Sequence, residues 1–178
     1  REGSPYADAS GQDWGDNWRR FAAFGRAAAD IAGGAAQGLS FDLVHAHDWQ
    51  AAMTLAYLRY APFDDVRPPS VITIHNMAFQ GYFDATVFPW LGLPGNAWSI
   101  DGVESYAGVG YLKAGLQAAD AITTVSPTYA GEIRSPAYGM GLEGIILARS
   151  NRVSGILNGI DTSAFNPAAD PFIPYPYD

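Results

Sequence analysis

The sequence predicts an α/β fold in which a small parallel sheet is flanked by helices, and two observations carry that prediction. Four short runs rich in apolar and β-branched residues have the composition of strands, and they lie at residues 41–47, 70–74, 121–125 and 152–157. Stretches with helical spacing of apolar residues lie between them, an alternation typical of parallel sheets. Strands of such sheets are normally buried on both faces, and we expect this of the runs at 41–47 and 70–74.

The sequence of the first half of the chain predicts a loop, a helix and then a strand–helix–strand unit. Residues 1–14 show no periodicity, whereas residues 16–31 place apolar side chains at helical spacing, and the glycines at 33–34 favour a helix end. The next helix is expected at 49–60, with Asp48 as its cap. Because this helix joins two parallel strands, the unit should be a right-handed crossover.

The second half contains one long connection and three further helices. Residues 76–102 are rich in Gly, Pro and aromatic residues, and loops of this length inside compact domains are usually functional. Helices are expected at 108–119, at 126–134, where a serine cap is followed by proline, and at 142–149. Proline alternates with aromatic residues near the end, so residues 162–178 are expected to be a tail or the start of a linker.

The composition indicates one globular domain. With 178 residues the chain is long enough for a core, and 48% hydrophobic against 16% charged residues excludes a disordered chain. A net charge of −8, with Lys113 as the one lysine, argues against nucleic acid or an anionic membrane as the partner. No apolar run approaches the ~20 residues of a membrane span. The absence of cysteine excludes disulfides and thiolate metal sites.

All three histidines, His45, His47 and His75, lie at or near the carboxyl ends of the first two predicted strands. Ligands bind at that edge of an open α/β sheet. The four strands should bring further polar and aromatic residues to the same edge, namely Asp48, Trp49, Asn76, Ser126, Asn158 and Asp161. We therefore expect a ligand site there.

The residue types at this edge leave several chemistries open. His45 and His47 are spaced as in metal sites of hydrolases, although few further ligands accompany them, and they are otherwise hydrogen-bonded strand residues. Asp48 either accepts hydrogen bonds from sugar hydroxyls or caps the helix, and Trp49 either stacks on a pyranose or fills the core. His75 is the strongest candidate for a catalytic group, the alternative being a buried structural histidine. The sequence contains no nucleophile elbow, dinucleotide-binding fingerprint or P-loop.

Six ordered stretches, which together span nearly the whole chain, carry a family resemblance. They are His45-Ala-His-Asp-Trp49, Thr73-Ile-His-Asn-Met-Ala-Phe-Gln-Gly81, Leu112-Lys-Ala-Gly-Leu116, Thr124-Val-Ser-Pro-Thr-Tyr-Ala130, Tyr138-Gly-Met-Gly-Leu-Glu-Gly144 and Leu157-Asn-Gly-Ile-Asp161. The set resembles the bacterial glycogen synthase and plant starch synthase family. Six motifs in order are far more specific than any one of them alone.

The resemblance implies a fold and an activity. Enzymes of this family have two facing Rossmann-like domains, the GT-B arrangement, with the active site in the cleft between them. They transfer glucose from ADP-glucose, or from UDP-glucose in some members, to the non-reducing end of an α-1,4-glucan with retention, and they need no metal or other cofactor. The expected substrates are therefore ADP-glucose and an α-1,4-glucan, and the expected location is the cytoplasm, or the plastid for a plant homologue.

The resemblance also implies roles for individual residues. His75 matches the catalytic-site histidine that contacts the donor glucose near its 6-hydroxyl. Asp48 and Trp49 match acceptor-side residues, and we group Asp48 with His75 as catalytic. Asn76 and Asn158 line the same cleft as substrate-binding residues. An oxocarbenium-like transition state is stabilised by such nearby dipoles in a cleft that excludes water.

Two family features do not appear in the sequence: the N-terminal Lys-x-Gly-Gly-Leu loop and the C-terminal GT-B domain that holds the diphosphate. We therefore expect residues 1–178 to be a single, partial N-terminal domain, cut at both ends and inactive alone. A non-catalytic glucan-binding module that uses Trp49, Tyr82 and Trp90 is one alternative. The metal-dependent hydrolase described above and a different GT-B transferase, such as a sucrose synthase relative, are the others.

Overall fold

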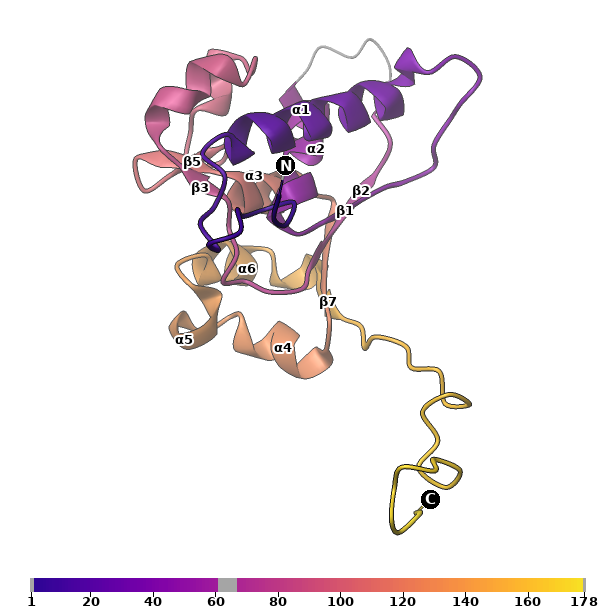
Figure 1. Cartoon of the computed structure of the whole chain (residues 1–178). Helices are drawn as coiled ribbons and strands as arrows, with labels where there is room; N and C mark the ends of the chain where they lie inside the picture. The colour runs from indigo at the N-terminus through magenta and orange to yellow at the C-terminus, as the bar shows by residue number, and fades with distance from the viewer. Residues whose placement is uncertain (1, 61–66, 178) are drawn as a thin grey trace.

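The structure, a computed structural model, describes residues 2–60 and 67–177, and a four-stranded parallel sheet lies at its centre (Figure 1). The strands are β1 (Val44–His47), β2 (Ser70–Ile74), β6 (Ala121–Thr124) and β7 (Val153–Gly155), in the spatial order β1-β2-β6-β7. Every neighbouring pair in this sheet is parallel. The α/β fold with a parallel sheet and flanking helices is therefore confirmed.

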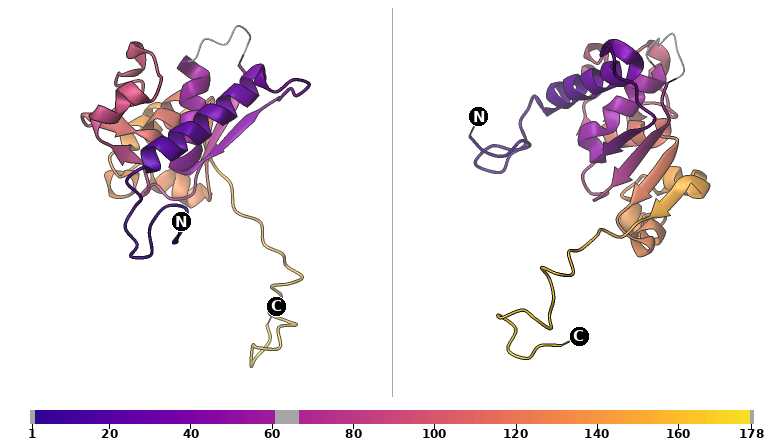
Figure 2. Two further views of the ribbon diagram at one scale, coloured as in Figure 1. Left: turned by 45° about the horizontal axis from the view of Figure 1, so that its top comes forward. Right: turned by 90° about the vertical axis from the view of Figure 1, so that its right-hand side faces the viewer.

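The helix α2 (Asp48–Tyr60) packs against both α1 (Asn17–Asp30) and α3 (Tyr111–Ala118), and Figure 2 shows α1 and α2 on the same side of the sheet. The close approach of α2 and α3 requires Gly115, because a Cβ atom there would lie 2.7 Å from the Cβ of Ala52. Fully buried side chains of these helices and of β2 form the centre of the core: Met53, Leu55, Ile72, Ile74, Leu112 and Leu116.

The unit β1–α2–β2 is the predicted strand–helix–strand crossover, in which His47 lies opposite Thr73. The bounds of β2 are those predicted, whereas β1 begins at Val44 and not at residue 41. The partner strand explains this difference. Pairing starts opposite Ser70, and the residues before it are prolines, which have no N–H to donate to a ladder.

The prediction that residues 41–47 are buried on both faces is wrong. Among the described strands β1 lies at the edge of the sheet. Ala46 points to the buried face, against which α2 packs, whereas His45 and His47 point to the opposite face and are exposed. The strand β2 lies between β1 and β6 and is buried along nearly its whole length, as predicted.

A three-stranded antiparallel sheet follows β2, in a region that the sequence presents mainly as a connection. Its strands, in spatial order, are β3 (Tyr82–Phe83), β5 (Gly108–Gly110) and β4 (Glu104–Ser105), and short 3₁₀ helices lie at Ala85–Trp90 and Gly95–Ala97. The prediction of a helix from residue 108 is corrected, because α3 begins at Tyr111. Gly108 belongs to the strand β5 instead. The strand packs closely there, because a Cβ atom at Gly108 would lie 2.5 Å from the ring of Tyr82.

Two helices after β6 confirm predictions from the sequence. The helix α4 (Pro127–Glu132) begins at the predicted cap, since Ser126 Oγ accepts a hydrogen bond from the N–H of Tyr129 at 2.9 Å. The helix α6 (Glu143–Ala148) lies within the predicted 142–149. A short additional helix, α5 (Pro136–Gly139), precedes it.

The two ends of the described chain lack long regular elements. After α1 the chain makes a π-helical turn at Ile31–Ala35, where Gly34 has a φ of 100°, in agreement with the predicted helix end at the glycine pair. After β7, residues 156–177 contain turns but no helix or strand, and Figure 1 shows them leading away from the sheet.

Candidate active site

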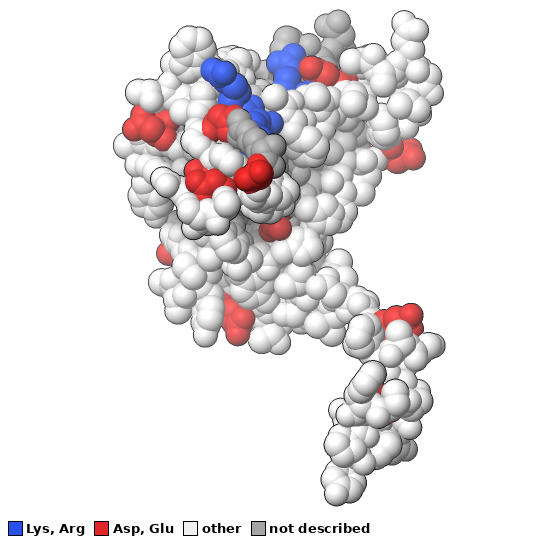
Figure 3. Space-filling view, viewed as in Figure 1, with Lys and Arg blue, Asp and Glu red and all other residues white. Residues whose placement is uncertain are grey.

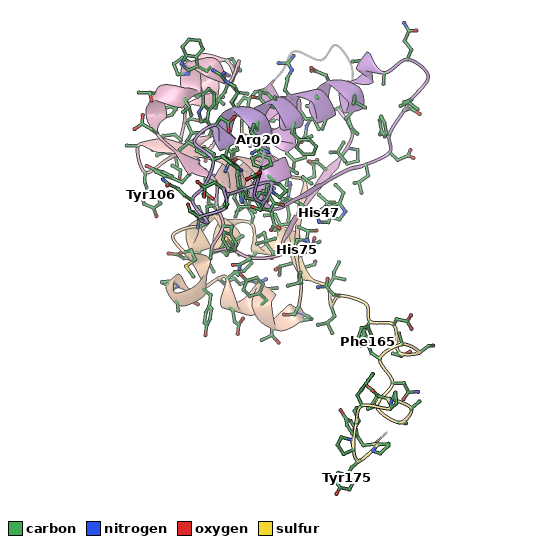
Figure 4. The ribbon with its side chains drawn as sticks, viewed as in Figure 1. Arg20, His47, His75, Tyr106, Phe165 and Tyr175 are labelled. Atoms are coloured by element: carbon green, nitrogen blue, oxygen red, sulfur yellow. The ribbon has the colours of Figure 1, made fainter. Side chains whose placement is uncertain are left out.

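The carboxyl ends of β1 and β2 meet at one edge of the sheet, where His47 and His75 lie side by side (Figure 4). His47 is the last residue of β1, and His75 follows directly after β2. Asp48, the first residue of α2, reaches the same point, because its Oδ1 accepts a hydrogen bond from the backbone N–H of His75 at 2.7 Å. Three elements thus hold these residues together.

The backbone of Asp48 makes this contact possible. Its φ of 52° lies in the left-handed region, which aspartate enters more readily than most residues because its short polar side chain can form local hydrogen bonds. The chain turns there from β1 directly into α2. The carboxylate therefore joins the start of α2 to the end of β2.

The three histidine rings form one row. His47 Nδ1 and His75 Nε2 lie 3.0 Å apart, which is a hydrogen-bonding distance. On its other side, His47 stacks against His45 with ring centroids 4.3 Å apart, and His45 Nε2 lies 2.6 Å from Thr73 Oγ1. Partial burial lowers the pKa of His47, and the neighbouring His45 and His75 lower it further, whereas Asp48 acts in the opposite direction.

Asn76 and Trp49 have clearly different surroundings. Asn76 is exposed, and its Oδ1 accepts a hydrogen bond from the N–H of Ala78 at 2.9 Å. Trp49 is only 7% exposed and meets Phe21 edge-on at a centroid distance of 4.7 Å. Gly81, whose φ is 62°, covers the indole so closely that a Cβ atom there would lie 2.3 Å from Trp49 Cε3. The core alternative for Trp49 is therefore confirmed.

Asn158 lies farther along the same edge, in the exposed segment that follows β7. The strand β6 separates β7 from β2, so normal strand spacing puts the ends of β7 and β2 roughly 10 Å apart. Two other residues expected at this edge have local partners: Ser126 caps α4, and Asp161 Oδ1 accepts a hydrogen bond from the N–H of Ser163 at 2.9 Å. The structure thus groups Asp48 with His75 and leaves Asn158 in the segment that follows a more distant strand.

A cavity of about 570 Å³ is lined in part by residues that follow the ends of β1 and β2 in the chain. Part of its wall continues directly from the site residues, because Trp49 and Gln50 follow Asp48 and residues 78–83 follow Asn76. The segment before α1 and its first turn supply the remainder. The lining residues are Tyr6, Asp13, Trp14, Asn17, Trp49, Gln50, Ala78, Phe79, Gln80, Gly81, Tyr82 and Phe83.

The sequence does not identify Tyr6, Trp14 or Phe79 as site residues. Tyr6 is held against the fold by its ring, which stacks on Phe21 at 6.0 Å, and by its carbonyl, which accepts a hydrogen bond from Asn17 Nδ2 at 2.7 Å. Phe79 is 63% exposed at the cavity. The available signal for Tyr6 and Trp14 was their bulk in an aperiodic segment rich in Gly, Ser and Asp. For Phe79 it was its place in the aromatic-rich connection at 76–102.

The described residues, 2–60 and 67–177, contain no group of three or more His, Cys, Asp or Glu side chains arranged to hold a metal ion. In the same part of the chain no helix combines the length and the apolar character needed to cross a bilayer. On the face shown in Figure 3, arginine side chains gather over α1, and acidic side chains are spread across other parts of that face.

Comparisons with known proteins agree on one family. Residues 1–148 match the family model of the starch synthase catalytic domain. The chain is 71% identical over 172 residues to the glycogen synthase of Novosphingobium aromaticivorans, covering 96% of this chain and 36% of that protein. It is 63% identical over 170 residues to the glycogen synthase of Mesorhizobium japonicum, covering 96% of this chain and 35% of that protein. The chain thus spans about a third of the length of these relatives.

A solved structure gives the same result. The catalytic domain of Starch Synthase IV from Arabidopsis thaliana, bound to ADP and acarbose, superimposes with a TM-score of 0.75 at 35% sequence identity. The match covers 93% of this chain and 34% of the chain in that plant structure. The family model, the bacterial relatives and the plant structure lead to one conclusion: the chain belongs to the starch synthase catalytic domain family.

Proposed function

We propose that this chain forms part of the active site of a glycogen synthase, which transfers glucose from ADP-glucose to the non-reducing end of an α-1,4-glucan with retention. Membership of the starch synthase family supports the reaction class. The plant structure bound to ADP and acarbose supports an adenine nucleotide as part of the donor. A second, C-terminal GT-B domain completes the site by holding the diphosphate. The reaction needs no metal or other cofactor and takes place in the cytoplasm.

One observation carries the proposal: the segments that follow Asp48 and His75 in the chain line an aromatic cavity. The exposed ring of Phe79 and the ring of Trp14 offer apolar faces that suit the C–H faces of glucose units. Amide and carboxylate groups in the wall, from Asp13, Gln50 and Gln80, suit the sugar hydroxyls. The cavity therefore fits a glucan acceptor whose end reaches the histidine edge.

In this proposal His75 is catalytic and contacts the donor glucose, and Asp48 is catalytic with it on the acceptor side. The backbone dipoles around His75 stabilise positive charge that develops at the anomeric carbon. Trp49 supports the acceptor cavity from the core, and Asn76 and Asn158 bind substrate from the ends of β2 and β7. A lone half of the cleft cannot exclude water from the reaction. We therefore expect the isolated chain to be inactive.

A chimaera tests the proposal. This chain replaces the 172 matched residues of the Novosphingobium aromaticivorans relative, and the product is assayed for ADP-glucose-dependent extension of malto-oligosaccharide. We expect turnover from the chimaera and none from the chain alone. A folded chimaera that binds malto-oligosaccharide without turnover would instead favour the non-catalytic glucan-binding module.

A further inference from the structure

The ring of His75 has a partner that neither the family resemblance nor the proposed reaction assigns to it. In the parallel pair of β1 and β2, His47 lies opposite Thr73. Side chains two residues apart along a strand share one face of the sheet. His45, His47, Thr73 and His75 therefore lie on one face, and this alignment brings His47 Nδ1 to 3.0 Å from His75 Nε2.

The ring of His47 has a second partner, His45. The two rings stack at a centroid distance of 4.3 Å. His45 Nε2 lies 2.6 Å from Thr73 Oγ1, which in turn lies 2.6 Å from Thr123 Oγ1 on β6. A chain of hydrogen bonds across three strands thus holds His45, and the His47 ring stacks on it with Nδ1 toward His75.

We propose that His47 is a positioning residue for His75: its Nδ1 holds His75 Nε2 and leaves His75 Nδ1 as the ring nitrogen that meets substrate. The proposal rests on the proposed function only where it speaks of substrate. The hydrogen bond requires one N–H and one lone pair. If His75 Nε2 donates, His75 Nδ1 is an acceptor, and if His47 Nδ1 donates, His75 Nδ1 carries the proton. In either case the hydrogen bond orients the ring of His75 and ties its tautomer to that of His47.

The charges around the pair favour this arrangement at neutral pH. The groups that face His47 are His45 from β1, His75 from the end of β2 and Asp48 from α2. Partial burial and the two other imidazoles lower the pKa of His47, which outweighs the opposite effect of Asp48. A neutral His47 keeps the shared hydrogen bond, whereas two protonated rings would face each other with N–H groups and positive charges.

Long-range ¹H–¹⁵N NMR of the histidine rings in this chain tests the hydrogen bond directly. We expect one dominant His75 tautomer in the wild type and a mixture, as in a free imidazole, in His47→Phe, which keeps the stacked ring but removes the nitrogen. His47→Asn restores an amide near the Nδ1 position and should restore one dominant tautomer. His45→Phe is the matched control, because it removes a histidine from the same row but leaves His47 Nδ1 in place.

The result that overturns the proposal is a His75 tautomer population that is the same in the wild type and in His47→Phe, with the amide spectrum showing that the variant is folded. If His47→Phe does not fold, the His75 tautomer populations of the wild type and of His47→Asn test the proposal. A wild-type His75 that averages between its two tautomers also overturns the proposal.

In the chimaera, His47→Phe should lower kcat by roughly tenfold to a hundredfold with little change in KM, and His47→Asn should recover part of it. A kcat within twofold of the wild-type value would overturn the substrate part of the proposal. A wild-type chimaera without activity would count against the proposed function alone, and the NMR populations would still decide whether His47 positions the ring.

Discussion

The carboxylate of Asp48 accepts a hydrogen bond from the backbone N–H of His75 at 2.7 Å, so the first residue of α2 holds the residue that follows β2. This contact crosses from one strand end to the next at the point where the two histidine rings also meet. The backbone of His75 and its ring thus have separate anchors.

Replacing Asp48 by alanine should lower the free energy of unfolding by about 1–3 kcal/mol, because the variant loses the hydrogen bond and retains a left-handed φ without a polar side chain. Asp48→Asn keeps an acceptor oxygen and tolerates this φ of 52°, so it should stay close to the wild type. Urea unfolding measures both. Equal losses in the two variants would contradict the role given to the acceptor oxygen.

Replacing His75 by alanine in the chimaera should reduce turnover by several orders of magnitude and leave the fold intact, because the ring that contacts the donor is removed. Circular dichroism monitors the fold. The matched control is His45→Phe, which removes an imidazole that hydrogen-bonds to Thr73 but keeps a ring to stack on His47. A loss below about tenfold in His75→Ala would make His75 a structural residue.

Replacing Phe79 by alanine should weaken malto-oligosaccharide binding by about tenfold, since one exposed aromatic face of the cavity is lost. Calorimetric titration of this chain measures the change. Phe172→Ala is the control, because Phe172 is 91% exposed in the segment after β7 and does not line the cavity. The same affinity for malto-oligosaccharide in both variants would show that the cavity is not part of the acceptor site.

Replacing Lys113 by methionine should lower the free energy of unfolding by about 1–3 kcal/mol. Lys113 is 6% exposed, and its Nζ donates to the carbonyls of Ile100 and, at 2.9 Å, of Gly102. Burial lowers the pKa of Lys113, although Glu104 acts in the opposite direction. The variant leaves these carbonyls without that donor. Arg152→Met, at an exposed position, is the matched control and should change stability by under about 0.5 kcal/mol.

The lowered pKa of His47 predicts a specific dependence of stability on pH. A histidine whose pKa is lower in the folded chain binds more protons when unfolded, so its contribution to stability is complete above the ordinary pKa of 6.5 and is lost as pH falls through the folded value. Wild-type stability should therefore decline more steeply than that of His47→Phe between about pH 7.5 and 5.5. Urea unfolding across that range measures both, and parallel profiles would contradict the prediction.

Local signals in the sequence determined much of the fold. The β-branched run at Ser70–Ile74 became β2 with the predicted bounds, because a short apolar strand between prolines and polar residues has few other conformations available. The serine–proline start of α4 was equally well defined by its own residues, since a cap acts within one turn. The clustering of the histidines at one edge followed from the order of the strands.

Tertiary structure decided what depended on distant partners. The length of β1 was set by where β2 begins to pair, and Gly108 joined a strand because Tyr82 lies against it. Tyr6 lines a cavity with Phe79, which lies far along the chain, and no pattern near either residue specifies that pairing. Periodicity and caps report on neighbours in sequence, whereas the hydrogen bond between His47 and His75 exists only because two strands lie side by side in one particular register.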